Sequence, residues 1–181
     1  MADGFVWEPG VDVMAWLRRA GVSRGDLVGL AVAPDAGLGL AATAGGWPVP
    51  PGAETGDLTT EVGLADEAFR PRWVVWSGET AAVLAARGVR LATCWDIAAV
   101  HRLLFGGWRA DPGSVWAHLR RLAPETMPAA GPPDLFQQAE AEGGDPDDPV
   151  GPAGYLRPEW VSGGWSGSPG RLARWAELAR T

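Results

Sequence analysis

The most constraining feature of the sequence is an alternation of short apolar runs and helical stretches between residues 72 and 105. Arg72–Trp76 is rich in β-branched and aromatic residues, which favours a strand. A helical pattern over Glu79–Arg87 follows, and Val89–Cys94 then predicts a second strand. Because strand–helix–strand units with tight connections make parallel pairs, this run predicts two parallel strands within a small mixed β-sheet flanked by helices.

Capping residues mark where the helices of this region begin. Ser77 stands directly before the first helix, and Asp96 is placed to cap a second helix that runs to about Phe105. Asp111 is followed by a proline, which is a favourable beginning for a third helix that we expect to end near Leu122. The chain is therefore predicted to have an α/β fold.

The N-terminal part predicts a helix and a β-hairpin. Residues 11–20 carry apolar side chains at helical spacing. Asp26–Ala33 and Leu38–Ala44 are two apolar runs around a Pro-Asp-Ala-Gly turn, which is typical of a hairpin. Gly45–Gly56 holds three prolines and four glycines and predicts a loop, and Leu58–Leu64 predicts a weaker third strand.

The chain is expected to divide into three parts. Residues 1–122 form the α/β domain, and residues 123–154 are a long acidic loop or linker rich in Pro and Gly, with little regular structure and high mobility. Residues 155–181 are a Trp-rich segment with a helix over 169–180 that packs on the domain.

Several properties bear on where the chain acts. No run of 18 uninterrupted apolar residues occurs, so we expect no contact with a membrane. The first bases are Arg18 and Arg19, which does not fit a secretory signal. The single cysteine, Cys94, lies in an apolar run and is expected to be a small buried residue in a reducing cytoplasm.

The basic residues offer candidates for nucleic-acid contact. All 15 are arginines, which fits a GC-rich coding bias, and the net charge of −7 argues against a dedicated nucleic-acid-binding module. Arginines interleaved with tryptophans can nevertheless follow a single strand by charge and stacking. The alternative is that these arginine stems lie over buried indoles. The candidates are Arg102, Trp108, Arg109, Arg120 and Arg121.

Motifs for catalysis are absent from the sequence. Two-metal phosphodiester chemistry needs converging carboxylates, and no Asp-x-Glu occurs anywhere in the chain. His101 and His118 lie 17 residues apart without further ligands at zinc spacing. No Gly-x-Ser-x-Gly, GxxxxGK[ST] or GxGxxG motif is present. We therefore expect no catalytic residue, no metal and no cofactor.

The run PRWVVWSGETAAVLAARGVRLATCWDIAAVHRLLFGG resembles the 3′–5′ exonuclease-like region of family A, polymerase I-like DNA polymerases. Trp95-Asp96-Ile97 stands at the family's Phe-Asp-Thr position, and Leu103-Leu104 matches the following leucine pair. The continuation through residue 169 resembles the actinobacterial branch described as bifunctional exonuclease and polymerase. The resemblance covers about residues 70–175 and implies an RNase H-like exonuclease fold with a role in DNA replication or repair.

This sequence departs from the family where the family has its catalytic carboxylates. Thr80 stands at the position of the second catalytic Asp and Trp76 at that of an Asn. The third motif, Tyr-x-x-x-Asp, is matched only in part, by Tyr155 and Glu159, and we expect a loop rather than a helix after Glu159. The resemblance thus implies a degenerate, catalytically silent domain whose partners are DNA or a polymerase domain.

Two alternatives remain at this stage. One is a residual metal-dependent exonuclease that uses a non-standard ligand set, Glu61, Glu79 and Asp96. The other is a free-standing actinobacterial interaction module with a Trp-rich surface.

Overall fold

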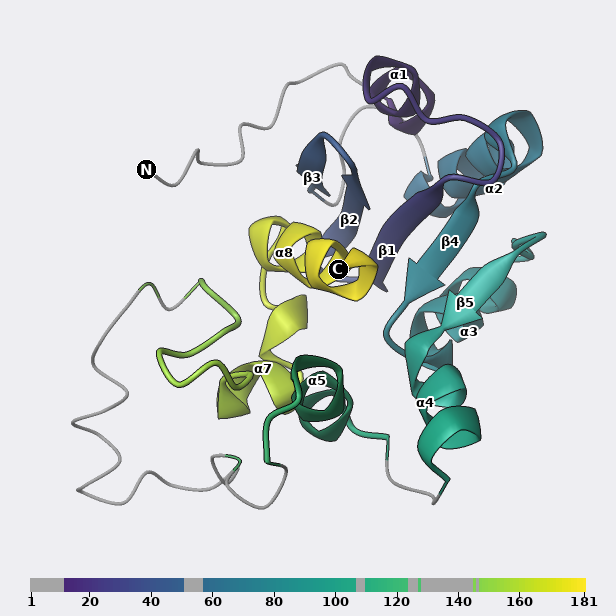
Figure 1. The fold of residues 1–181 in the computed structure, drawn as a ribbon. Coiled ribbons are helices and arrows are strands. Elements are labelled where there is room, and N and C mark those ends of the chain that lie inside the picture. The colour runs from purple at the N-terminus through teal and green to yellow at the C-terminus, as the bar shows by residue number, and fades with distance from the viewer. Residues whose placement is uncertain (1–11, 51–56, 107–109, 124–126, 128–144, 146) are drawn as a thin grey trace. The chain divides into compact units, whose positions relative to one another are not determined.

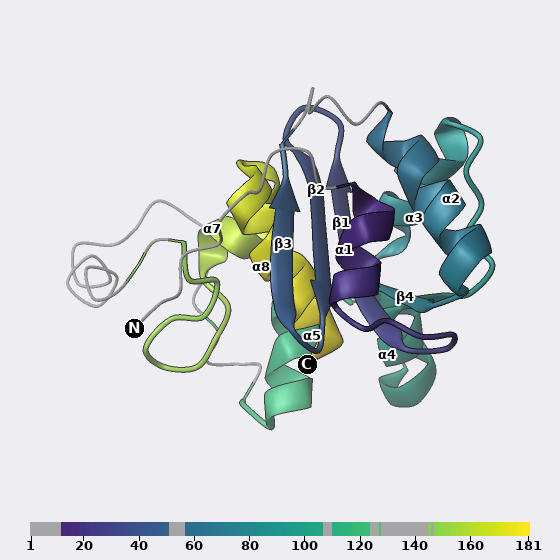
Figure 2. The same cartoon turned by 90° about the horizontal axis from the view of Figure 1, so that it is seen from above.

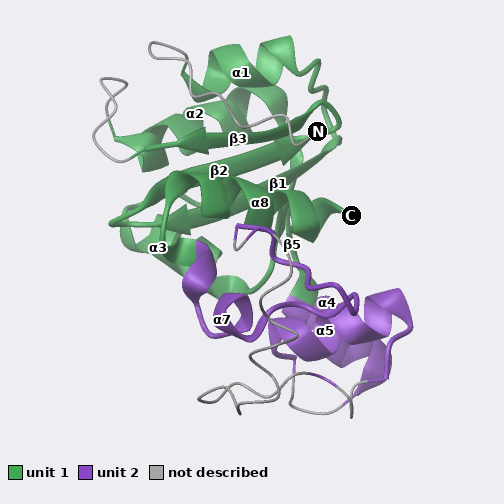
Figure 3. Cartoon of the chain, turned by 90° about the vertical axis from the view of Figure 1, so that its left-hand side faces the viewer, with its two compact units in different colours: residues 1–97, 166–181 green, residues 98–165 purple. Residues whose placement is uncertain are grey.

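The computed structural model describes residues 12–50, 57–106, 110–123, 127, 145 and 147–181. The chain divides into two compact units, one formed by residues 1–97 with 166–181 and the other by residues 98–165 (Figure 3). Most of the predicted acidic loop, including residues 128–144, lies outside the described residues.

A five-stranded mixed sheet forms the centre of the first unit (Figure 1). Its strands, in the spatial order β3-β2-β1-β4-β5, are β1 (Leu27–Ala33), β2 (Gly37–Ala42), β3 (Gly45–Val49), β4 (Arg72–Val75) and β5 (Cys94–Asp96). The first three form an antiparallel meander, whereas β4 pairs in parallel with both β1 and β5. The predicted hairpin, the parallel pair and the mixed α/β sheet are confirmed.

Two predictions for residues 45–64 are wrong. The expected loop begins with β3, because Gly45 adopts a φ of 121° that allows a tight turn out of β2. Pro48 is tolerated in β3 because this strand lies at the edge of the sheet. The expected weak strand is instead helix α2 (Leu58–Phe69), which Asp57 caps by accepting a hydrogen bond from the Thr59 amide.

The last strand is shorter and later than the sequence suggests. The Ala92 amide donates to the buried Asp66 carboxylate over 3.0 Å, and Trp73 Nε1 donates to the same carboxylate over 2.9 Å. Residues 89–93 do not form the expected strand, since the Ala92 amide is bonded to the Asp66 side chain rather than to a neighbouring strand, and β5 begins only at Cys94. Cys94 is exposed, so the prediction that it is a buried residue is wrong.

One face of the sheet carries its large side chains. Leu30, Leu40 and Trp47 are register partners across three strands and point to this face. They pack with α1 (Val13–Arg19), α2 and α3 (Gly78–Ala86), and Trp16 of α1 stacks on Trp47 with ring centroids 5.6 Å apart. Figure 2 shows α1 and α2 on this side of the strands.

The opposite face carries small residues and receives the C-terminal helix α8 (Pro169–Arg180), whose predicted bounds are confirmed. Along β1 and β2, the residues on this face are Gly29, Ala31, Gly39 and Ala41. A Cβ added at Gly29 or Gly39 would lie well under 3.0 Å from the backbone of α8. The helix backbone therefore rests directly on the sheet.

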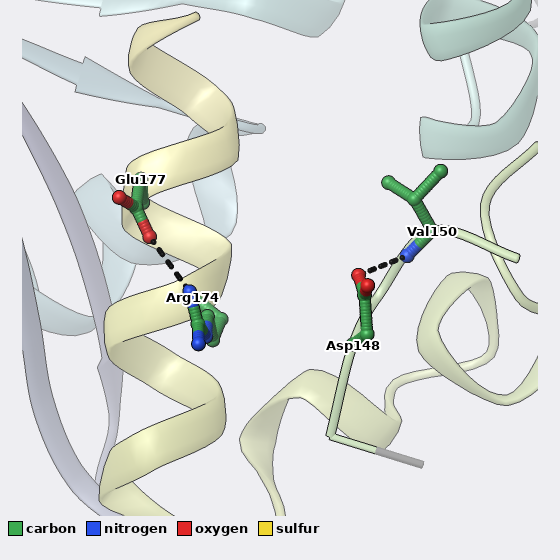
Figure 4. Close-up of polar contacts among 4 residues, drawn as sticks. All are labelled: Asp148, Val150, Arg174 and Glu177. Carbon is green, nitrogen blue, oxygen red and sulfur yellow. Dashed lines mark hydrogen bonds and ion pairs between the residues drawn. The ribbon is translucent and has the colours of Figure 1, made fainter. Parts of the chain in front are cut away.

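Away from the sheet, Arg174 and Glu177 form an ion pair of 3.4 Å (Figure 4).

The second unit contains α4 (Ile97–Phe105) from Ala98 onward, α5 (Pro112–Arg120) and the single-turn helix α7 (Pro158–Val161). Asp111 caps α5 as predicted, by accepting from the Ser114 amide over 2.9 Å. Trp116 donates its indole N–H to the Gly154 carbonyl over 2.8 Å. Nearby, the Asp148 carboxylate accepts from the Val150 amide over 3.0 Å (Figure 4). Among the described residues, no helix has the length and apolar character needed to cross a membrane.

Candidate functional site

The carboxyl ends of the parallel strands are where sites form in α/β folds, and Asp96 lies there. Asp96 ends β5 and pairs in register with Val75 of β4. Its Oδ2 lies 3.4 Å from the position that a Cβ on Gly78 would occupy, so the carboxylate faces the first turn of α3. This arrangement suits stabilisation of a helix N-terminus by a negative charge.

The positions at which the resemblance places polar catalytic residues are occupied here by packing residues. Trp76 is buried, stacks on Trp175 with ring centroids 4.5 Å apart, and donates Nε1–H to the Trp175 carbonyl over 2.8 Å. Thr80 is buried in the first turn of α3. Both side chains are packed inside the first unit, and neither is the residue that the family has at its position.

The first strand supplies no carboxylate either. β1 reads LVGLAVA, and Gly29 on this strand lies against the backbone of α8. In the second unit, Tyr155 donates its hydroxyl to the Ala123 carbonyl over 3.1 Å. Glu159 lies in the first turn of α7, a helix that ends two residues later at Val161 and is followed by a turn.

The structure places two of the three residual acidic candidates, Glu79 and Asp96, at the beginning of α3 and the third, Glu61, at the beginning of α2. Glu61 Oε2 accepts from the Val13 amide over 3.1 Å and thereby joins α2 to the beginning of α1. Glu79 lies exposed in the first turn of α3, and Asp96 faces that same turn. Within the described part of the chain, no group of three or more His, Cys, Asp or Glu side chains could hold a metal ion.

Three of the arginine candidates lie exposed in the second unit. Arg102 is on α4, and Arg120 and Arg121 are at the end of α5. The Arg120 guanidinium lies 4.4 Å from the ring centroid of the buried Trp116, as the packing alternative requires for this residue. Trp108 and Arg109 lie outside the described residues.

Sequence reasoning missed a histidine pair between α4 and α5. His101 Nε2 and His118 Nδ1 are 2.8 Å apart, and Phe105 stacks on His118 with ring centroids 4.9 Å apart. Burial lowers the pKa of His101, and the neighbouring His118 and Arg102 lower it further against the opposing charge of Asp111. The spacing of His101 and Phe105, one helical turn apart, was the available signal that both lie on one helix face.

Two further features concern reactivity and exposure. The pKa of the Cys94 thiol is raised, first by desolvation and then by the charge of Asp96, so Cys94 is a poor nucleophile at neutral pH. On α4, Leu103 and Leu104 expose 86% and 72% of their surface, so these leucines do not serve the core.

Searches of protein-family models, curated proteins and solved structures found no match to this chain.

Proposed function

We propose that the chain is a catalytically silent, RNase H-like domain, related to the 3′–5′ exonuclease region of family A DNA polymerases. Its role would be structural or DNA-steering, in DNA replication or repair. The observation that carries the proposal is the strand order β3-β2-β1-β4-β5 combined with the residues that occupy the expected catalytic positions.

The sheet topology supports the fold part of the proposal. An antiparallel meander of three strands that continues into two parallel strands through helices is the strand arrangement of RNase H-like domains. Here the helices α2 and α3 make the two connections. A fold by itself does not carry an activity, so the function has to be argued from the side chains.

The side chains support the loss of catalysis. β1 carries no acidic residue, Thr80 is buried, and Trp76 donates its indole N–H to the Trp175 carbonyl. Metal-dependent phosphodiester cleavage depends on ions that carry the nucleophile and stabilise the leaving group. Asp96 is the one described carboxylate at the matched motif positions of β4, α3 and β5, and a single carboxylate does not hold two such ions.

The DNA-steering part rests on Arg102, Arg120 and Arg121. Each is exposed on the second unit and can pair with phosphate. We expect weak binding to a short single strand that falls with salt, because about 0.7 counterion is released for each phosphate neutralised.

The test measures fluorescence anisotropy of a labelled single strand over a range of salt concentrations. In Arg120→Gln/Arg121→Gln, the slope of log affinity against log salt should decrease by about 1.4, because two phosphate contacts are lost. Arg24→Gln, in the exposed turn before β1, is the control and should leave the slope unchanged. Equal effects of the two changes, or no binding by the wild type at low salt, would refute DNA steering.

A second candidate is an interaction module, and the exposed Leu103 and Leu104 favour it. If these leucines bind a partner protein, Leu103→Ser/Leu104→Ser should abolish that binding while leaving DNA affinity unchanged.

A further inference from the structure

The histidine pair His101–His118 is the strongest cluster of titratable groups away from the carboxylate positions. The two rings bring helices α4 and α5 of the second unit together, and Phe105 contacts both of them, with centroid distances of 4.9 Å. His101 and Ala98 are the buried residues of α4, whereas Leu103, Leu104 and Phe105 are exposed. The attachment of α4 to α5 therefore depends strongly on one buried imidazole.

The hydrogen-bond geometry determines which protonation states this pair accepts. His101 Nδ1 is buried and has no hydrogen-bond partner among the described residues. An unpaired N–H at that position would be costly, so the proton of neutral His101 is on Nε2 and is donated to Nδ1 of His118. His118 must then be unprotonated at Nδ1.

A proton added to either ring breaks this arrangement. If His118 gains a proton at Nδ1, two N–H groups face each other unless the proton of His101 moves to its buried Nδ1, where no described residue accepts it. If His101 gains the proton, the charge is buried beside Arg102, and among the described residues the charge of Asp111 opposes this unfavourable effect. Both routes disfavour the packed state.

We propose that the His101–His118 pair is a pH-sensitive contact that holds α4 on α5 when both rings are neutral and releases α4 on acidification. This role is independent of DNA binding and of the missing carboxylates.

The direction of the effect follows from the histidines themselves. The pKa of His101 is lowered in the folded chain, so the neutral form is favoured by folding. The stabilisation is complete above the unfolded pKa of about 6.5 and is lost as the pH falls below that value. At pH 5.0, which is about 1.5 units lower, protonation of His101 in the open state should increase the opening of α4 by up to about 30-fold.

The experiment measures hydrogen exchange of the full chain between pH 7.5 and 5.0, corrected for the intrinsic exchange rate, with EDTA present because adjacent imidazoles bind transition metals. Protection over residues 98–105 should fall by about 10- to 30-fold, while β1 keeps its protection. In His101→Phe/His118→Phe, which retains aromatic rings but cannot titrate, protection of α4 should not depend on pH.

A second readout covers the case in which the double variant does not fold. The chain has only two histidines, so their ring signals in NMR spectra of the wild type belong to this pair. The titration midpoint of His101 should lie below 6.5. A midpoint at or above 6.5, constant protection of α4 in the wild type, or an equal loss of protection in a folded double variant would overturn the proposal.

Discussion

Alanine at Gly29 or Gly39 should separate α8 from the sheet. At Gly29 the added Cβ would lie 2.8 Å from the carbonyl carbon of Ala176, and at Gly39 it would overlap the backbone of Leu172. The Ala176 carbonyl oxygen lies closer still, and ordinary contact begins only at 3.4 Å, so α8 has to move away from the sheet. The obstacle is helix backbone, which cannot change rotamer, so we expect a loss near the upper end of the overpacking range, about 3 kcal/mol.

The assay is thermal and urea unfolding followed by circular dichroism. For a chain of this length, about 3 kcal/mol corresponds to a decrease in Tm of about 6–12 °C. Gly63→Ala is the matched control: Gly63 lies inside α2, and its added Cβ would meet Val89 at 3.4 Å. This control should be stabilised by about 0.5–1 kcal/mol, because Ala favours helix. If Gly39→Ala unfolds within 0.5 kcal/mol of the wild type, direct contact between α8 and the sheet is refuted.

Two further changes test the fold. Asp66→Ala should cost about 2–3 kcal/mol in urea unfolding, because it leaves the buried Trp73 indole N–H and the Ala92 amide without their acceptor. Asp66→Asn keeps a carbonyl oxygen for Trp73 but turns its NH2 group toward the Ala92 amide, so it should cost less than Asp66→Ala while remaining destabilising; equal losses would contradict this. Leu103→Ser/Leu104→Ser should change the free energy of unfolding by less than about 0.5 kcal/mol for each residue, because both side chains are largely exposed; a loss of about 2 kcal/mol would show that they serve a core.

The sequence predicted the elements whose local signals agree with their tertiary setting. Between β4 and α4, the capping and turn residues can be recognised from short stretches of sequence. The parallel pairing of β4 with β5 follows because the helix α3 connects them. It did not reveal β3 or α2, because the glycines and Pro48 read as a loop and the β-branched residues of Leu58–Leu64 read as a strand. β3 and α2 are both stabilised by burial in the same core, which contains Trp47 and Val62. Such burial brings together residues distant in the sequence, so short sequence patterns do not reveal it.

The close approach of α8 was also missed, for a similar reason. The alternating glycines and alanines of β1 and β2 predict a hairpin, but the sequence of these strands does not show that α8, distant in the sequence, will pack its backbone against them. The candidate site shows the same limit. Absence of Asp-x-Glu is visible in the sequence, whereas the hydrogen bond between His101 and His118 arises only when two helices meet.

The most direct test of the central claim is a nuclease assay on 3′-labelled single-stranded DNA with the purified chain in Mg²⁺ or Mn²⁺. The account predicts no metal-dependent cleavage by the wild type, and the same null result for Asp96→Ala, which should keep its fold and lose only stability. Cleavage that persists through repurification and disappears in Asp96→Ala or Glu79→Ala would contradict it, because it would mean that these carboxylates still support catalysis.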